Sequence, residues 1–110
     1  MDLQTITDAR GNLTVIEKLP FEIKRVYYLY GVPPKETRGG HKHITTERMI
    51  IAISGSFVAQ INDDEPLYLH SPKQGLFIPK MAWLKLSNFS KDGICLVIAS
   101  TEHDDADCIR

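Results

Sequence analysis

Short apolar runs, separated at close intervals by turn-forming residues, most limit what this chain can fold into. About eight or nine such runs occur at spacings near 8–12 residues, with Gly, Pro, Asn and Asp between them, and no segment has the 3.6-residue period of a helix. This pattern is typical of an all-β sandwich or barrel. The clearest expected strands are 13–16, 21–30, 48–54, 57–61, 67–70, 76–78, 82–86 and 94–99.

Length and composition narrow the class of protein further. A chain of 110 residues predicts a single domain, residues 1–110, that buries a core without disulfides, and Cys95 in its apolar run is expected to be buried. The net charge is −1 and no basic cluster exceeds Lys24-Arg25, so we expect no nucleic-acid partner. With no signal peptide and no apolar run near ~20 residues, we expect a cytoplasmic protein that does not enter a membrane.

Alternation in the segment 21–30 places charged and aromatic residues on one face. Arg25, Tyr27 and Leu29 share one side of the predicted strand, while Val26 and Tyr28 share the other. If the first face is the interior, Arg25 lies among apolar neighbours. Because a buried guanidinium is costly without a partner, we expect Arg25 to face a ligand or a carboxylate.

The segment Arg38–His43, with the sequence Arg-Gly-Gly-His-Lys-His, is the main candidate for chemistry. We interpret it as a polar cluster that a loop delivers to the start of the buried strand 48–54. His41 and His43 are two residues apart and would lie on the same side of an extended chain. The pair is open to three interpretations: a metal site, an acid–base pair, or two solvent-exposed histidines without a role.

The metal interpretation is the weakest of the three. His41, His43 and Glu47 form H-x-H-x₃-E, close to the first motif of metal-binding cupins, and such ligands suit Fe, Mn, Zn or Ni. The second cupin motif supplies a further histidine, but here Leu84 stands at that position after Pro79. We therefore expect no metal.

Acid–base catalysis requires a group that titrates near neutral pH, and histidine is the side chain that does so unperturbed. Arg38 would favour the neutral, basic form of an imidazole and could hold an anionic substrate. Outside this segment, His70 and His103 are expected on a surface strand and in a mobile tail. Trp83 is expected in the core or in a pocket wall.

Five motifs occur in order along the chain: Asp8-x-Arg10-Gly11, the strand from Pro20 to Tyr28, Arg38-Gly39-x-His41-x-His43, Pro79…Trp83, and Asp104…Asp107-x-Ile109-Arg110. Together they resemble one family, the WxcM-like sugar 3,4-ketoisomerases, which convert dTDP-4-oxo-6-deoxy-D-glucose to its 3-oxo isomer. The D-x-R-G motif and the later R-G-x-H suggest a wider similarity to the dTDP-4-dehydrorhamnose 3,5-epimerases.

This resemblance implies a cupin jelly roll that is a homodimer, uses no cofactor or metal, and shifts a carbonyl through an enediol. His41 and His43 match the family's acid–base pair. The residues expected to contact the dTDP-sugar are Arg10, Arg25, Tyr27, Arg38 and Trp83.

One departure leaves other functions open. The family often has histidine after the tryptophan of the fourth motif, where this chain has Leu84. A non-catalytic cupin that binds nucleotide sugar as a sensor is therefore an alternative, and an epimerase acting on a similar nucleotide sugar is another.

Overall fold

The computed structural model describes residues 1–109, and at Gly40, His41, Asp105 and Ile109 it describes the backbone alone. The described chain is built from strands and one short 3₁₀ turn, η1 (Asp105–Asp107). The strands are β1 (Gln4–Asp8), β2 (Gly11–Val15), β3 (Arg25–Leu29), β4 (Arg38–His43), β5 (Arg48–Ser54), β6 (Phe57–Ile61), β7 (Leu67–Leu69), β8 (Gly75–Ile78), β9 (Trp83–Ser87), β10 (Ile94–Ala99) and β11 (Cys108–Ile109).

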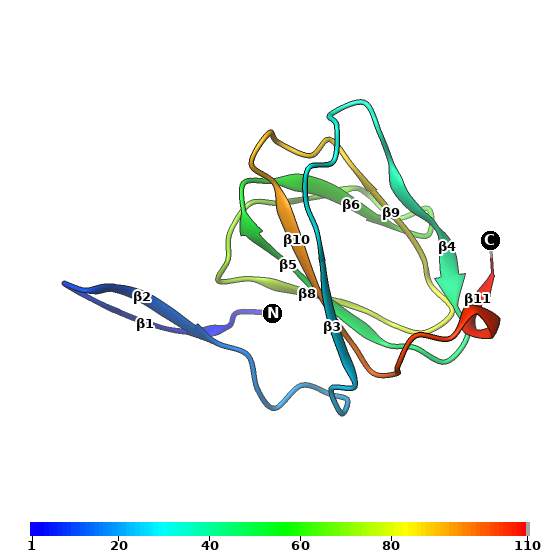
Figure 1. Cartoon of the computed structure of the whole chain (residues 1–110), viewed down its shortest axis with the longest axis horizontal. Helices are drawn as coiled ribbons and strands as arrows, with labels where there is room; N and C mark the ends of the chain where they lie inside the picture. The colour runs from blue at the N-terminus through cyan, green and yellow to red at the C-terminus, as the bar shows by residue number, and fades with distance from the viewer. Residues whose placement is uncertain (110) are drawn as a thin grey trace.

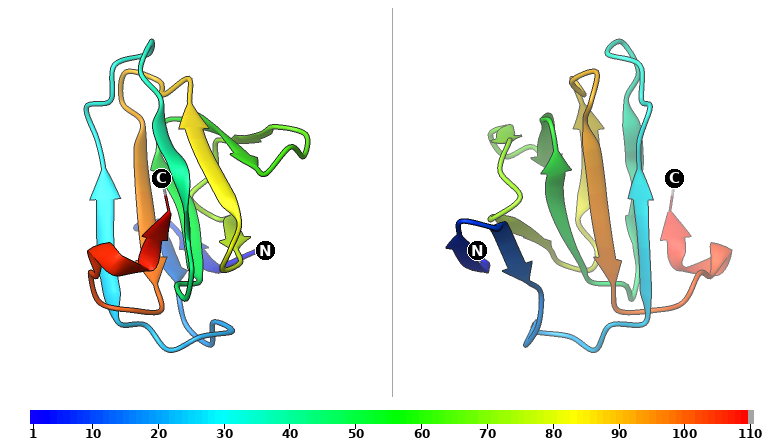
Figure 2. Two further views of the ribbon diagram at one scale, coloured as in Figure 1. Left: turned by 90° about the vertical axis from the view of Figure 1, so that its right-hand side faces the viewer. Right: turned by 60° about the vertical axis from the view of Figure 1, so that its left-hand side comes forward.

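Two antiparallel sheets face each other and enclose the core (Figures 1 and 2). One has the strand order β3-β10-β5-β8, and the other has the order β11-β4-β9-β6-β7. The β1–β2 hairpin forms a third, two-stranded sheet that projects away from the sandwich (Figure 1). The predicted all-β sandwich is confirmed.

Strand β5 is apolar on both faces because both faces are covered. Ile50 and Ala52 face the main core between the sheets, while Met49 and Ile51 face outward and are also fully buried. The outer face is covered by residues from the segment 16–21 and from β8 and β10. A strand covered on two sides needs a continuous apolar run, which is the pattern that the sequence displays.

The main core is most densely aromatic between β6 and the loop that follows β9. The rings of Phe57 and Phe89 stack with centroids 5.0 Å apart, and both side chains are buried. Cys95 is buried beside them in β10, as expected from its apolar run.

The observed strands agree best with the predictions where the apolar pattern is strongest. The bounds of β5, β6 and β10 are those predicted. The predicted strand 21–30 is only Arg25–Leu29, and Ile23 before it is 44% exposed.

Two predictions about segments outside these strands are wrong. The segment Arg38–His43 is itself a strand, β4, rather than a loop. The segment after Ser100, expected as a mobile tail, folds back and pairs with β4 through β11, so it belongs to the sandwich. No helix in the part of the chain that the structure describes is long and apolar enough to span a membrane.

Candidate active site

The candidate site occupies one end of the inner face of the four-stranded sheet. Ala99 of β10 pairs with Arg25 of β3 on one side and with Arg48 of β5 on the other, so all three side chains share the inner face. The small side chain of Ala99 leaves room for two long ones. The register thus brings two arginines together on the inner face of this sheet.

Strand β3 alternates as the sequence predicted. Arg25, Tyr27 and Leu29 are half-buried and face inward, while Val26 and Tyr28 are exposed. The Arg25 guanidinium lies over the Tyr27 ring at 5.1 Å from its centroid. The predicted inward face of this strand is confirmed.

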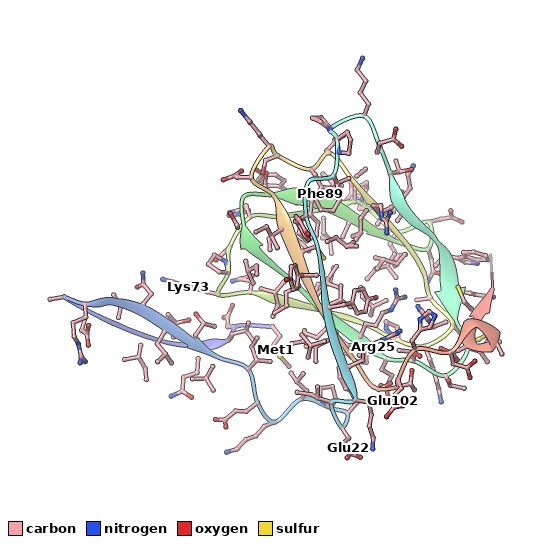
Figure 3. The ribbon with its side chains drawn as sticks, viewed as in Figure 1. Met1, Glu22, Arg25, Lys73, Phe89 and Glu102 are labelled. Carbon is pink, nitrogen blue, oxygen red and sulfur yellow. The ribbon has the colours of Figure 1, made fainter. Side chains whose placement is uncertain are left out.

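The partner found for Arg25 is a histidine. Its Nη1 lies 3.2 Å from Nδ1 of His103, in the tail segment beyond β10. Arg25 and Glu102 lie at the same end of the molecule (Figure 3). His103, which we expected in a mobile tail, therefore contacts the candidate site. No ion pair in the described residues joins Arg25 to a carboxylate.

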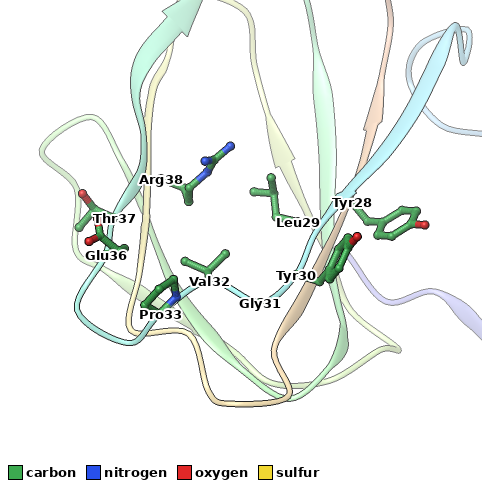
Figure 4. Close-up of a pocket in the computed structure, with 9 residues that line it drawn as sticks. All are labelled: Tyr28, Leu29, Tyr30, Gly31, Val32, Pro33, Glu36, Thr37 and Arg38. Carbon is green, nitrogen blue, oxygen red and sulfur yellow. The ribbon is translucent and has the colours of Figure 1, made fainter.

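A small cavity of about 80 Å³ lies between the two sheets next to these arginines. It is lined by Tyr27, Leu29, Arg38, Gly39, Arg48, Leu84, Leu86 and Val97. A second, open pocket of about 330 Å³ begins where this cavity ends, since both are lined by Leu29 and Arg38. In Figure 4, Arg38 points inward across this opening, and the β3–β4 loop forms the rim.

A bulge in β4 sets which residues stand opposite the buried leucines of β9. Arg38 pairs with Leu86 and the backbone of His41 pairs with Leu84. An advance of three residues along β4 therefore corresponds to an advance of two residues along β9, which is the mark of a β-bulge. Gly39 has φ +92°, and a Cβ there would lie 2.3 Å from the Leu84 carbonyl oxygen. Only glycine fits this approach. The side chain of His41 lies outside the described part of the structure.

His43 forms the best-defined polar contact of the site. Its Nδ1 lies 3.0 Å from Oδ2 of Asp107, and both side chains are largely buried, with exposures of 12% and 6%. Asp107 reaches this position because β11 pairs with β4 and the Asp107 carbonyl accepts a hydrogen bond from the Ile44 amide. Asp107 was absent from the predicted site.

Several donors surround the Asp107 carboxylate. The Thr45 amide donates to Oδ1 at 2.6 Å, and the Thr45 and Thr46 hydroxyls also donate to the carboxylate. Burial raises the pKa of Asp107, but the hydrogen bonds from Thr45, Thr46 and His43 outweigh it and hold that pKa well below its ordinary value.

The ionised state of Asp107 decides which nitrogen of His43 carries a proton. A carboxylate only accepts hydrogen bonds, so Nδ1 of His43 is the donor in this pair. In the neutral imidazole, Nε2 is then the basic nitrogen. The arrangement is that of a general base whose tautomer is fixed by a buried carboxylate.

Two predicted substrate contacts lie away from this cavity. Trp83 is 38% exposed on the outer face of β9, where Lys42 lies 5.4 Å from its ring centroid, so its expected place in the core is wrong. Arg10 stands at the tip of the projecting hairpin and pairs with Asp8 at 2.8 Å. Within one chain, neither residue joins Arg25, Tyr27 and Arg38.

The residues with described side chains contain no group of three His, Cys, Asp or Glu placed to hold a metal ion. Glu47, the third ligand of the metal interpretation, is half-buried, and its backbone amide donates a hydrogen bond to the Ser100 hydroxyl oxygen. The expectation of a metal-free site stays a prediction, since the His41 side chain is outside the description.

Sequence reasoning missed two residues of the site, Arg48 and Asp107. Arg48 is only 3% exposed. In the sequence it is the first residue of an apolar run, and this position indicates only the start of a strand. Asp107 is 64 residues from His43 in sequence, so only the fold brings them together. The tail motif that begins at Asp104 was the one available signal for Asp107.

Comparison with known proteins gives the same assignment along the whole chain. The family model described as FdtA, WxcM-like, C-terminal, matches residues 1–110. A curated relative, the TDP-4-oxo-6-deoxy-alpha-D-glucose-3,4-oxoisomerase of Aneurinibacillus thermoaerophilus, is 34% identical over 116 residues, covering 100% of this chain and 84% of that protein.

Solved structures agree in fold and in family. A 3,4-ketoisomerase from Helicobacter canadensis has a TM-score of 0.95 at 36% identity, covering 99% of this chain and 86% of that one. The sugar 3,4-ketoisomerase QdtA of Thermoanaerobacterium thermosaccharolyticum, solved with TDP, has a TM-score of 0.95 at 35% identity, with coverage of 99% and 84%.

A more distant structure extends the likeness in fold. The dTDP-4-dehydrorhamnose 3,5-epimerase of Bacillus anthracis has a TM-score of 0.84 at 14% identity, covering 97% of this chain and 74% of that one. The predicted cupin jelly roll and the resemblance read from the five motifs are both confirmed.

Proposed function

The chain belongs to the WxcM-like, C-terminal family, and on that premise we propose that it is a sugar 3,4-ketoisomerase acting on dTDP-4-oxo-6-deoxy-D-glucose. The product would serve deoxysugar synthesis for a surface polysaccharide. The single domain 1–110 would act in the cytoplasm, because a charged nucleotide diphosphate does not cross a membrane unaided.

The observation that carries this proposal is the His43–Asp107 pair at the edge of an arginine-lined interior. The reaction requires a base to remove the proton from sugar C3 and an acid to return a proton to C4. Nε2 of His43, made basic by the Nδ1–Asp107 contact, suits one of these transfers. His41, two residues earlier on β4, is proposed as its partner in the acid–base pair.

The cations are proposed to bind the substrate's charge. Arg38 stands where the interior cavity meets the open pocket, so it suits the diphosphate, which an arginine fork can bind in a bidentate manner. Arg25 and Tyr27 face inward beside the cavity and suit the sugar. Trp83 would contact only a part of the substrate that extends over the outer face of β9.

The homodimer is part of this proposal. The β1–β2 hairpin projects from the sandwich, and Ile6 and Leu13 on it are 53% and 56% exposed. Packing against a second copy would bury this apolar surface. It would also allow Arg10 at the hairpin tip to reach the substrate of another copy, which it cannot do within its own chain. Sedimentation or light scattering measures the association directly.

The test is to incubate the protein with dTDP-4-oxo-6-deoxyglucose in D₂O and follow the sugar by NMR. A ketoisomerase moves the carbonyl from C4 to C3 and places deuterium at C4. Exchange with inversion and no carbonyl shift would instead identify an epimerase.

The leucine at position 84 is an observation in favour of one alternative function, a cupin that binds nucleotide sugar without catalysis. It is buried at 4% exposure and lines the cavity, so no titratable group is contributed from this position of β9. Tight binding of dTDP with no hydrogen exchange in D₂O would support this alternative and contradict the ketoisomerase.

A further inference from the structure

Arg48 is a buried cation that none of the proposed roles uses so far. Its side chain is 3% exposed, and its Nε and Nη2 atoms are buried without a hydrogen-bond partner among the described residues. None of the ion pairs between described residues involves it. A guanidinium with this little compensation costs folding free energy, so its presence here calls for a functional explanation.

The groups of the described chain that act on Arg48 are Tyr27, Cys108 and Arg25, and none of these is a carboxylate. Arg25 lies on the same face across Ala99, while Tyr27 and Cys108 belong to β3 and β11. Burial lowers the pKa of Arg48, and the interaction with Tyr27 offsets part of that effect. An arginine starts from so high a pKa that it keeps its charge. The site therefore presents an unbalanced positive charge to whatever enters the cavity.

The volume of the cavity limits which part of a ligand can reach Arg48. Its volume of about 80 Å³ compares with about 30 Å³ for one water molecule in the liquid, so it admits a few polar atoms and not a nucleoside diphosphate. The larger pocket of about 330 Å³ adjoins this cavity at Leu29 and Arg38 and lacks Arg48 in its lining. The nucleotide therefore suits the outer pocket, and only the sugar end reaches inward to Arg48.

We propose that Arg48 is a catalytic residue of the ketoisomerase, whose guanidinium donates hydrogen bonds to the sugar oxygen that becomes negatively charged in the enediolate. This inference rests on the proposed function. When the base removes the C3 proton, the C–H electron pair forms the C3=C4 bond and the carbonyl pair moves onto O4. The hydroxyl proton on O3 then passes to O4, and protonation of C4 leaves the carbonyl at C3.

The surroundings of Arg48 strengthen its effect on that charge. Leu84 and Val97, both buried, line the same cavity together with Leu29 and Leu86, so much of its wall is apolar. A fixed donor in such apolar surroundings stabilises a developing oxyanion more than it would in water, and it needs no reorganisation during the reaction. The neutral 4-oxo sugar gains less from the same contact, so the difference lowers the barrier.

The test compares Arg48→Met with Arg48→Lys, and uses Lys85→Met as the matched control. Lys85 is exposed on the outer face of β9, next to Leu84 in sequence. We expect Arg48→Met to lower kcat by about 10²–10³-fold, as for loss of one oxyanion donor. Arg48→Lys should recover part of that loss, and Lys85→Met should leave kcat unchanged.

Two further measurements separate catalysis from a structural role. The affinity for dTDP should stay within about twofold of the unaltered protein, because the nucleotide does not reach Arg48. The Tm of Arg48→Met should be equal to or above that of the unaltered protein, since an apolar side chain replaces a poorly paired buried ion. If this variant does not fold, Arg48→Gln removes the charge while keeping a polar side chain, and the same loss of kcat is expected.

Each other outcome overturns a stated part of the proposal. If Arg48→Met and Arg48→Gln turn over like the unaltered protein, Arg48 is not catalytic, although the ketoisomerase assignment stands. If they lose dTDP affinity at unchanged kcat, Arg48 binds nucleotide instead. If the unaltered protein does not isomerise dTDP-4-oxo-6-deoxyglucose, both the proposed function and the role of Arg48 fall together.

Discussion

The two ends of the inner face of the four-stranded sheet share the same strands and differ in chemistry. At one end, Ala99 lies between Arg25 and Arg48, and at the other, Cys95 lies between Leu29 and Ala52. In both places one residue of β10 lies between a residue of β3 and a residue of β5. At the Cys95 end this sheet contributes only apolar side chains, whereas at the Ala99 end it contributes two arginines whose charge the packing does not neutralise.

The pKa of Cys95 shows how strongly burial at the apolar end disfavours an ionised side chain. Burial raises the pKa of the Cys95 thiol to about 12, and the positive charge of Arg48 offsets only part of that rise. The thiol is therefore an inert packing group at neutral pH. The comparison predicts that substitutions at the polar end change turnover and that substitutions at the apolar end change stability.

The largest expected effect is at the polar end. His43→Asn should lower kcat by roughly 10³–10⁴-fold, because it removes a general acid–base group. His41→Asn is expected to have a comparable effect, and both variants should retain their affinity for dTDP. Steady-state kinetics and calorimetric titration measure the two quantities. His70→Asn, which alters an exposed histidine beside β7, is the matched control, and unchanged turnover in His43→Asn would refute the assignment.

At the apolar end, Phe57→Ala should reduce the free energy of unfolding by about 3–5 kcal/mol, because it leaves a cavity against Phe89. The kcat of the molecules that remain folded should be unchanged at low temperature. Urea unfolding followed by circular dichroism gives the stability change, and Val58→Ala on the same strand provides the comparison. A loss of kcat with full stability would show that the two ends are not separable.

Asp107 tests the polar end in another way, because it hydrogen-bonds to His43 and is not expected to contact the substrate. Asp107→Asn should lower kcat by about 10²-fold, since an amide can hold the His43 ring in the wrong tautomer. KM should change little. An unshifted pH profile of kcat/KM in this variant would contradict a role through His43.

The smallest expected effect concerns acid stability. Because the pKa of Asp107 is lower in the folded protein than in the unfolded chain, its contribution is fully present above about pH 4 and is lost as the pH falls further. Unfolding free energies measured from pH 7 to pH 3 should therefore decline more steeply for the unaltered protein than for Asp107→Asn. Parallel curves would show that Asp107 does not stabilise the fold through its charge.

The sequence predicted the fold best where local pattern and tertiary structure agree. Apolar runs bounded by turn residues located β5, β6 and β10. Strand β4 could not be found in this way, because Arg-Gly-Gly-His-Lys-His has no apolar alternation. Its extended form comes from pairing with β9 on one side and β11 on the other, which are contacts between distant segments.

The same limit applies to the site. Alternation placed Arg25 and Tyr27 on the inner face, and the strand has that orientation. Trp83 was misplaced because its neighbour Leu84, and not Trp83, faces inward. The His43–Asp107 contact depends on the register between β4 and β11, which no local pattern in the chain encodes.

The bulge at Gly39 and Gly40 changes by one residue the alternation of inward- and outward-facing positions along β4. A strand repeats every two residues, and a regular pairing of the same sequence would place Gly40 opposite Leu84 and the backbone of His41 opposite Trp83. Trp83 stands on the outer face of β9, so His41 would then occupy an outward-facing position of the pairing. The single extra residue of the bulge therefore decides which member of the Arg-Gly-Gly-His-Lys-His segment meets the interior.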